Sequence, residues 1–171
     1  MANWVFALLA VSAAVLSAQV KAPQLELVAE LSATVDPPVD VGPTPRGQHR
    51  IIPITGGTFT GPKLKGKILP GGADWQFIHD DGLTEIEARY TLETSDGVRI
   101  PVLSKGVRHG PKEVLARLAA GQNVDPSEYY FRTSMSFQPP KGAYEWMERS
   151  VFVAVGERYK DRVLIRVWRL P

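Results

Sequence analysis

The residues of this sequence that could do chemistry are carboxylates, tyrosines and arginines on predicted strands, where an ordinary core would hold apolar side chains. Asp74 or Glu148 could act as a general base if burial raises the pKa of its carboxyl group. A tyrosine could supply a proton, and an arginine could stabilise the charge of a developing enolate or phenolate. We expect the catalytic groups to be Asp74, Glu148, Tyr130 and Arg89, with Tyr90 and Arg132 as the alternative acid and stabiliser.

A second set of residues is expected to form the walls of a binding pocket. Alternation along segment 85–93 places Glu87 and Arg89 on one face and Tyr90 on the other. In a small barrel one of the two faces points inwards, where a charged side chain has to be paired. For any one of these charges, a position facing solvent is the alternative. We expect Asp74, Arg89 and Arg132 to share one cavity, with substrate contacts from Arg132, Tyr90, Trp75, Trp146 and Glu87.

Several classes of site are excluded by what the sequence lacks. With no cysteine, there can be no disulfide, thiolate metal site or cysteine nucleophile. The three histidines, His49, His79 and His109, do not have the spacing of a zinc enzyme. The sequence has no nucleophile elbow, phosphate-binding loop or dinucleotide fingerprint. We therefore expect a site that uses neither a metal nor a cofactor.

Composition and charge narrow the choice of partners. A hydrophobic content of 44% and a charged content of 22% are those of an ordinary globular protein. The net charge of +2 is small, and the basic residues are scattered rather than grouped with aromatic ones, which argues against nucleic-acid binding. We expect a small-molecule ligand or substrate as the partner. A homodimer is the one assembly left open.

Short alternating runs separated by turns predict a mostly β protein. Asp-Gly at 81–82 and at 96–97 provides the positive φ that tight hairpins need. Such strands, with a turn every 8–12 residues or so, are typical of a sandwich or a barrel. The predicted strands are 25–31, 50–55, 58–60, 63–69, 74–79, 85–94, 99–105, 130–137, 150–157 and 163–169.

Glycine and proline mark three other features. The doublets at 56–57 and 71–72 indicate positive φ or a close approach of the backbone to a neighbour. Segment 36–45 contains four prolines, so it is expected to be a linker and neither a central strand nor a helix. Segment 111–120 begins with proline and is followed by Gly121, which predicts one helix. This helix could plug an end of a barrel or cover a ligand there.

The N-terminus has the pattern of a targeting segment. Residues 4–18 form an uncharged apolar run that is too short for a membrane span but long enough for the core of a signal peptide. We expect a signal peptide at 1–22, export to the periplasm or medium, and no stable membrane insertion after cleavage. The remaining residues, 23–171, would form a single domain. An uncleaved anchor or a misplaced start codon is the alternative.

Five motifs follow one another along the chain: Arg-Ile-Ile-Pro-Ile-x-Gly-Gly-x-Phe-x-Gly (50–61), Leu-x-Gly-x-Ile-Leu-Pro-Gly-Gly-Ala-Asp-Trp (64–75), Ala-Arg-Tyr-x-Leu-x-Thr-x-Asp-Gly (88–97), Tyr-Phe-Arg-Thr (130–133) and Tyr-x-Trp (144–146). In this order they resemble the motifs of the family known as domain of unknown function 3237, and the resemblance covers about residues 25–170. It implies an all-β, single-domain antiparallel β-barrel that is lipocalin-like, with one short α-helix, and it implies no settled activity.

Two departures from the family pattern bear on the chemistry. Ser104 stands where the family has the asparagine of Asn-x-Gly, and Glu148 stands where it has the asparagine of Trp-Leu-Asn. An asparagine can only orient a substrate, whereas a glutamate can exchange a proton. If residue 148 lines the pocket, this change adds an acid or a base.

Three functions are compatible with these observations. The first is a cofactor-independent acid–base enzyme (a lyase, isomerase, dehydratase or cyclase) acting on a small aromatic or polyketide-like molecule. The second is an exported carrier of small hydrophobic ligands, which would use the mouth of the barrel. The third is a structural or protein-binding module with a filled barrel. A charged internal cavity would favour the first, an open apolar one the second, and a filled barrel the third.

Overall fold

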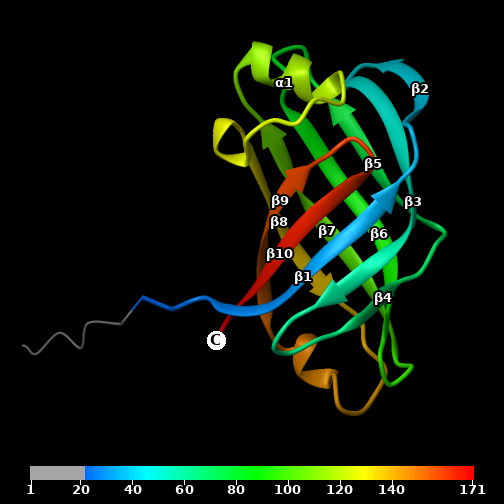
Figure 1. The fold of residues 1–171 in the computed structure, drawn as a ribbon, viewed down its shortest axis with the longest axis vertical. Coiled ribbons are helices and arrows are strands. Elements are labelled where there is room, and N and C mark those ends of the chain that lie inside the picture. Colours follow the sequence, from blue (N-terminus) through cyan, green and yellow to red (C-terminus); the bar gives the residue numbers. More distant parts are fainter. Residues whose placement is uncertain (1–21) are drawn as a thin grey trace, which may run out of the picture.

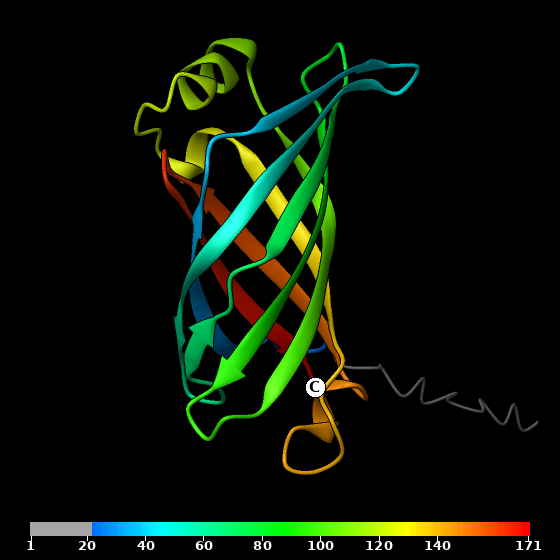
Figure 2. The ribbon, with the colours of Figure 1, turned by 90° about the vertical axis from the view of Figure 1, so that its right-hand side faces the viewer.

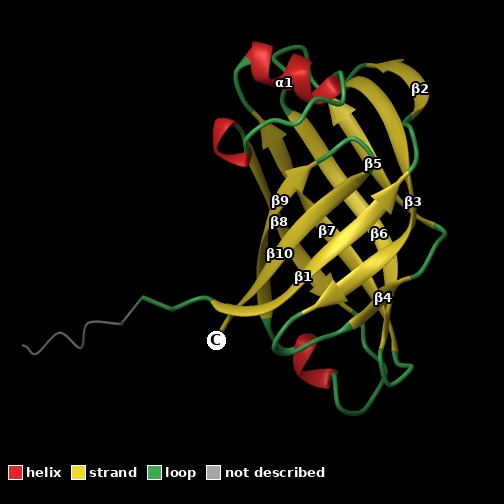
Figure 3. Cartoon of the chain, in the orientation of Figure 1, coloured by secondary structure: helices red, strands yellow, loops and turns green. Residues whose placement is uncertain are grey.

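The computed structural model describes residues 22–171, and it consists almost entirely of strands (Figure 3). The signal peptide expected at 1–22 therefore lies outside the described residues, apart from its last position. Ten strands are present: β1 (Glu26–Val35), β2 (Val39–Thr44), β3 (Gly47–Thr60), β4 (Gly66–Ile68), β5 (Gly72–Ile78), β6 (Thr84–Thr94), β7 (Arg99–His109), β8 (Tyr130–Phe137), β9 (Val151–Arg158) and β10 (Arg162–Leu170).

Antiparallel pairing closes these strands into a barrel. β1 pairs with β10 on one side and with β3 on the other, so the sheet has no free edge at this point. The closed ring consists of β1, β3, β5, β6, β7, β8, β9 and β10, and β2 and β4 are additional strands. Closure satisfies the strand edges that an open sheet would leave exposed. The predicted all-β antiparallel barrel is confirmed.

Each end of the barrel is covered by a short helical segment. Helix α1 (Lys112–Ala119) lies over one end, beside the β2–β3 hairpin (Figures 1 and 2). The 3₁₀ turn η2 (Glu145–Met147) covers the opposite end, near the C-terminus. A second 3₁₀ turn, η1 (Pro126–Glu128), leads into β8. The helix predicted at 111–120 is thus confirmed, whereas η2 was not predicted.

Two apolar clusters fill the barrel from its two ends. The larger cluster includes Leu92, Ile100 and Phe152, and η2 closes it with the side chain of Met147. The smaller cluster joins α1 to the strands beneath it through Val114, Leu118, Val124, Ile86, Tyr129 and Phe131. Strand alternation produces this filling because every second side chain of β6 and β8 is buried. The space between the two clusters is where a polar site can lie.

The glycine and proline positions have the structural roles expected of them, with one difference. Gly57 has a φ of +133°, and a Cβ atom there would lie 2.0 Å from the carbonyl oxygen of Ser32 on β1. Only glycine therefore allows β3 to pass this close to β1. The proline-rich segment is not a simple linker, because residues 39–44 form the outer strand β2. Pro43 is tolerated there because β2 is an edge strand, paired with β3 alone.

Candidate functional site

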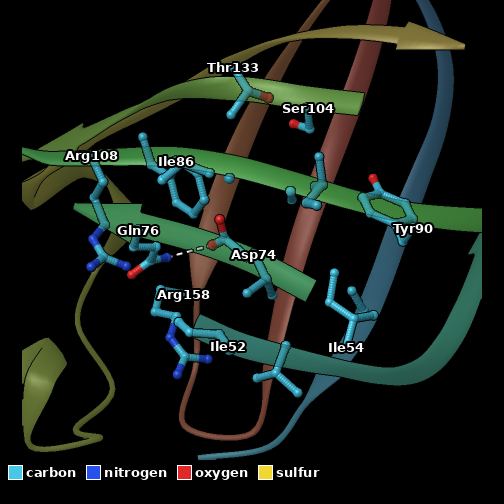
Figure 4. A pocket seen from close by; sticks show the side chains of 17 residues that line it. Ile52, Ile54, Asp74, Gln76, Ile86, Tyr90, Ser104, Arg108, Thr133 and Arg158 are labelled. Carbon is cyan, nitrogen blue, oxygen red and sulfur yellow. Dashed lines mark hydrogen bonds between the residues drawn. The ribbon is translucent and has the colours of Figure 1, made fainter. Parts of the chain in front are cut away.

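A cavity lies inside the barrel between the two apolar clusters (Figure 4). Its volume is about 40 Å³, which is room for a few water molecules at about 10–15 Å³ each. Most of its wall is apolar or small, with Ile52, Ile54 and Ala88 among the lining residues. The polar and charged side chains in the wall are Asp74, Gln76, Tyr90, Ser104, Arg108, Thr133 and Arg158.

The carboxyl group of Asp74 is held from one side only. The side-chain amide of Gln76 donates a hydrogen bond of 2.5 Å to Oδ2 of Asp74. Oδ1 of Asp74 is buried and has no hydrogen-bond partner among the described residues. Figure 4 shows the oxygen of Asp74 that is joined to Gln76, and it shows the other oxygen directed away from Gln76. One carboxylate oxygen is thus left without a hydrogen bond from the described residues.

Pairing with the neighbouring strands explains why Asp74 points inwards. In the register of the sheet, Asp74 lies opposite Ile52 of β3 and Ala88 of β6. Residues that lie opposite each other on paired strands point to the same face of the sheet. Ile52 and Ala88 are buried on the inner, apolar face, so Asp74 points to that face as well. Trp75, the next residue, consequently points outwards beside Glu87.

Three arginines surround this carboxyl group, and none of them forms an ion pair within the described residues. Arg50 of β3 donates to Oε1 of Gln76 from Nε (2.9 Å) and Nη2 (2.7 Å), so it reaches Asp74 only through that amide. Arg108 of β7 is 7% exposed, and its buried Nε has no partner. The side chain of Arg158 on β9 donates one hydrogen bond within the described residues, from Nη1 to the carbonyl oxygen of Arg162 at 3.5 Å.

Towards α1 the cavity adjoins a larger chamber, which we call the mouth chamber. Its volume is about 440 Å³, within the range of small-molecule sites. Three residues, Val35, Arg108 and Arg158, line both the cavity and this chamber. The rest of its wall is formed by Pro37, Pro38, Arg50, Ile78, Gly82, Thr84, Leu115, Leu118, Ala119, Ala120, Gly121, Lys160 and Asp161. Arg108 and Arg158 therefore lie where the two spaces meet, and Arg50 lies in the mouth chamber.

Burial changes the protonation behaviour of the site. Removal from water raises the pKa of Asp74 to about 6, although the Gln76 hydrogen bond and the charges of Arg108 and Arg50 oppose this rise. Burial and the like charges of Arg50 and Arg158 lower the pKa of Arg108 to about 10. Burial also raises the pKa of Tyr90, with a smaller contribution from Asp74. At neutral pH the site therefore holds a carboxylate that can still accept a proton, a protonated arginine and a neutral phenol.

The raised pKa of Asp74 predicts a pH-dependent stability. Because the pKa is about 6 in the folded protein and 3.8 in the unfolded chain, the stability from this group is complete below pH 3.8 and is lost as the pH rises through 6. The free energy of unfolding of the wild type, relative to Asp74→Asn, should fall by roughly 3 kcal/mol at most between pH 4 and pH 7. Urea unfolding at four pH values measures this difference. The exposed Asp161, replaced by Asn, is the control, and a difference that is constant with pH would contradict the shift.

Two of the nine residues selected from the sequence line the cavity. Asp74 and Tyr90 both do so, and the hydroxyl group of Tyr90 is buried without a partner. Arg89, Glu87 and Trp75 lie on the opposite faces of β6 and β5, outside the barrel. There Glu87 forms ion pairs with Arg89 (2.8 Å) and Lys105 (2.8 Å). The expectation that Asp74 and Arg89 share one cavity is therefore wrong, because alternation places them on opposite faces of the sheet.

The remaining four selected residues also lie outside the cavity. Tyr130 and Arg132 are exposed on the outer face of β8, where Tyr130 stacks on His109 and Arg132 lies over the Tyr130 ring. Trp146 is half-buried in η2 and packs on Phe152. Glu148 is exposed directly after η2, at the end of the barrel opposite α1. The structure therefore does not bring these four residues to Asp74.

Six residues around Asp74 were not predicted from the sequence: Gln76, Ser104, Thr133, Arg108 and Arg158 of the cavity, and Arg50 of the mouth chamber. The sequence does contain a pattern that could have identified the arginines. Each arginine lies on the same strand face as a series of apolar or small residues, at every second position. Ile54 and Ile52 lead to Arg50, for example, and Ala154 and Gly156 lead to Arg158. Ser104 had a second signal, because it is one of the two departures from the family pattern, and it is 3% exposed.

No metal site accompanies these residues. Within residues 22–171, no three His, Asp or Glu side chains gather closely enough to hold a metal ion. In the same residues, no helix is long and apolar enough to cross a membrane.

Comparison with known proteins gives the family of this chain. The model of a family described as "Protein of unknown function (DUF3237)" matches residues 23–170. A UPF0311 protein of Bradyrhizobium diazoefficiens is 44% identical over 137 residues, which are 80% of this chain and 90% of that protein.

Two solved structures share the fold. A β-barrel-like protein from Acinetobacter baumannii has a TM-score of 0.80 and 41% sequence identity, over 91% of this chain and all of that one. A protein described as an enzyme, from Penicillium herquei, has a TM-score of 0.68 and 18% identity, again over 91% of this chain and all of that one. At this identity the second likeness is one of fold alone.

Proposed function

Because this chain belongs to the DUF3237 family of proteins of unknown function, we propose its activity from its own cavity: it is a cofactor-independent acid–base enzyme. The reaction would be a proton transfer of the lyase, isomerase, dehydratase or cyclase type, on a small aromatic or polyketide-like molecule. The observation that carries the proposal is the buried carboxyl group of Asp74, which has one unpaired oxygen and a pKa of about 6. A distant neighbour of the same fold is described as an enzyme.

Asp74 is the base in this proposal. A general base works best when its pKa lies near the working pH, because it is then both ionised and able to hold a proton. An exposed aspartate is a weaker base, and a fully paired one is occupied by its partner. Gln76 holds Oδ2, so Oδ1 is the atom that would take the proton from the substrate.

Arg108 and Tyr90 complete the proposed chemistry. Arg108 carries a positive charge in a buried position and has an unpaired Nε. It can therefore stabilise the oxyanion that forms when Asp74 removes a proton next to a carbonyl or aryl group. Tyr90 keeps its proton because its pKa is raised, and its unpaired hydroxyl group can donate a hydrogen bond. These two residues replace Arg89 and Tyr130 of the sequence-based expectation.

A generic substrate for a buried base tests the proposal without knowledge of the natural one. In 5-nitrobenzisoxazole, a base removes the C3 proton, the C–H electron pair forms the nitrile, and the N–O bond breaks to release a coloured phenolate. We expect the protein to accelerate this elimination, with a rate that rises with pH and is half-maximal near pH 6, the pKa of Asp74. No acceleration over the same concentration of acetate, or a midpoint near pH 4, would count against the proposal.

A carrier of small ligands is the second candidate, and the mouth chamber favours it. This chamber is larger than the cavity, and Pro37, Pro38 and Leu115 give it apolar walls. A carrier would bind ligands there without accelerating the elimination of 5-nitrobenzisoxazole.

We also propose that the protein is exported, whether it is an enzyme or a carrier. N-terminal sequencing of protein from the native host tests it, and an intact Met1 in the cytoplasmic fraction would overturn it.

A further inference from the structure

The arginines of the mouth chamber differ from the others in the described chain because they are buried or half-buried and yet have no carboxylate partner. Seven arginines form ion pairs within 4.0 Å: Arg46, Arg89, Arg99, Arg117, Arg162, Arg166 and Arg169. Of the five others, Arg132 and Arg149 are exposed, and solvent satisfies their charge. The remaining three, Arg50, Arg108 and Arg158, converge on the mouth chamber from three different strands.

The charge of this region is unbalanced. The mouth chamber is lined by four cationic side chains, the three arginines and Lys160, and by one carboxylate, Asp161. The side chain of Asp161 is 78% exposed and lies 3.7 Å from Arg162. Among the described residues, Asp74 is the only other carboxylate that lines either space. The side chains that line the two spaces therefore carry an excess of two positive charges, and burial of unpaired charge is unfavourable unless a ligand compensates for it.

Part of the chamber's lining is apolar. Pro37 and Pro38 follow β1, and Leu115 of α1 lies against the turn between β5 and β6, where a Cβ atom on Gly82 would be 2.8 Å from Leu115 Cδ1. Ile78 and Leu118 are further apolar lining residues. A molecule in the chamber would thus meet apolar side chains as well as guanidinium groups.

We propose that the mouth chamber binds an organic anion with an apolar body, whose carboxylate or phenolate oxygen is held by Arg108 and Arg158, with Arg50 beside them. This inference rests on the proposed function, since it names the substrate class of the same site. Guanidinium groups are suited to carboxylates because their N–H donors match the two oxygens. The anionic end lies at the boundary of the inner cavity, and the apolar body lies beneath α1.

A matched pair of probes tests the inference by isothermal titration calorimetry. 1-Naphthoate and 1-naphthamide have the same ring system and differ in the charge of one group. We expect naphthoate to bind at least about tenfold more tightly than the amide, and to weaken as salt is added. Arg158→Gln should weaken naphthoate about 10–100-fold, as expected for a hydrogen bond to a charged group, and should leave the amide unchanged. Arg89→Gln, on the outer face, is the control and should change neither.

The apolar wall and Asp74 provide two further readouts. Leu115→Gln should weaken both probes alike, because it changes the wall and not the charge. Asp74→Asn should tighten naphthoate binding severalfold at pH 8, since it removes a negative charge beside the arginines. The groups that face this aspartate are Arg50, Arg108, Arg158, Gln76 and Tyr90. The pKa of Arg108 is about 10 and that of Tyr90 is raised by burial, so neither of these two groups changes its protonation below pH 8.

The results separate the inference from the proposed function. Tight binding of naphthoate without any elimination of 5-nitrobenzisoxazole would support the anion site and contradict catalysis. Elimination without a preference for naphthoate would support catalysis and overturn the anion site. Three other results would also overturn the anion site: equal affinity for naphthoate and naphthamide, an equal loss of affinity for both probes in Arg158→Gln, or no binding of either probe.

Discussion

Asp74→Asn should lower the rate of 5-nitrobenzisoxazole elimination by about 10²–10⁴-fold, the usual contribution of a general base. Asparagine keeps the shape of the side chain and can still be held by Gln76, but its amide cannot accept the proton. The loss should appear in kcat with little change in KM, because the substrate body contacts the mouth chamber rather than Asp74. Initial rates across pH 4–9 measure the effect, and the rise in rate near pH 6 should disappear in the variant.

Glu148→Gln is the comparison that decides between the two carboxylates expected from the sequence. Glu148 is exposed at the end of the barrel opposite α1, so its replacement should leave the rate within about twofold of the wild type. Circular dichroism and the unfolding midpoint confirm that both variants are folded. If Glu148→Gln lost activity and Asp74→Asn kept it, the assignment of the base to the cavity would be wrong.

Arg108→Met should make the protein more stable and less active. In the folded protein the pKa of Arg108 is lowered to about 10 by burial and by its like-charged neighbours, so its charge opposes folding at neutral pH. Methionine has a similar length and no charge, and replacing a buried charge that lacks an ion-pair partner should raise the free energy of unfolding by about 1–3 kcal/mol. The elimination rate should fall by about 10²–10³-fold, because the phenolate loses its stabilising cation.

The pH–rate profile distinguishes a role of Arg108 in catalysis from a purely structural role. Removal of the Arg108 charge takes away a group that lowers the pKa of Asp74, so the midpoint of the pH–rate profile should move above pH 6. Arg89→Met is the matched control: it removes an exposed ion pair with Glu87 and should change stability by less than about 1 kcal/mol. A loss of stability in Arg108→Met similar to that of a core truncation would show that the charge supports the fold.

Much of the fold could be predicted from local patterns. Alternation identified the strands, Gly82 and Gly97 have the positive φ expected at two hairpin turns, and the helix between Pro111 and Gly121 lies where it was predicted. These features depend on neighbours in the sequence, so the sequence contains the information to place them. The edge strand β2 was missed because Pro43 and the prolines beside the strand exclude a central strand, but they do not exclude a strand that is paired on one side only.

The site could be predicted only in part, because alternation divides a strand into two faces without saying which face is inside. On β5, Asp74 and Gln76 oppose Trp75 and Phe77, and composition alone would bury the aromatic pair. The structure buries Gln76 to 2% exposure instead. The reason is the register with Ile52 and Ala88, which belongs to the neighbouring strands and not to β5.

The sequence by itself therefore determined the barrel, its turns, its helix and the presence of Asp74 and Tyr90 among the candidates. The tertiary structure decided which charges meet. Arg50, Arg108 and Arg158 are about fifty residues apart along the chain, on β3, β7 and β9. On each strand the arginine follows a series of inward-facing apolar or small residues, and no one strand alone indicates that the three arginines meet. Closure of the sheet brings these three arginines to the same end of one barrel, beneath α1. Long-range strand pairing creates that proximity, and it is not encoded in the local spacing of any one segment.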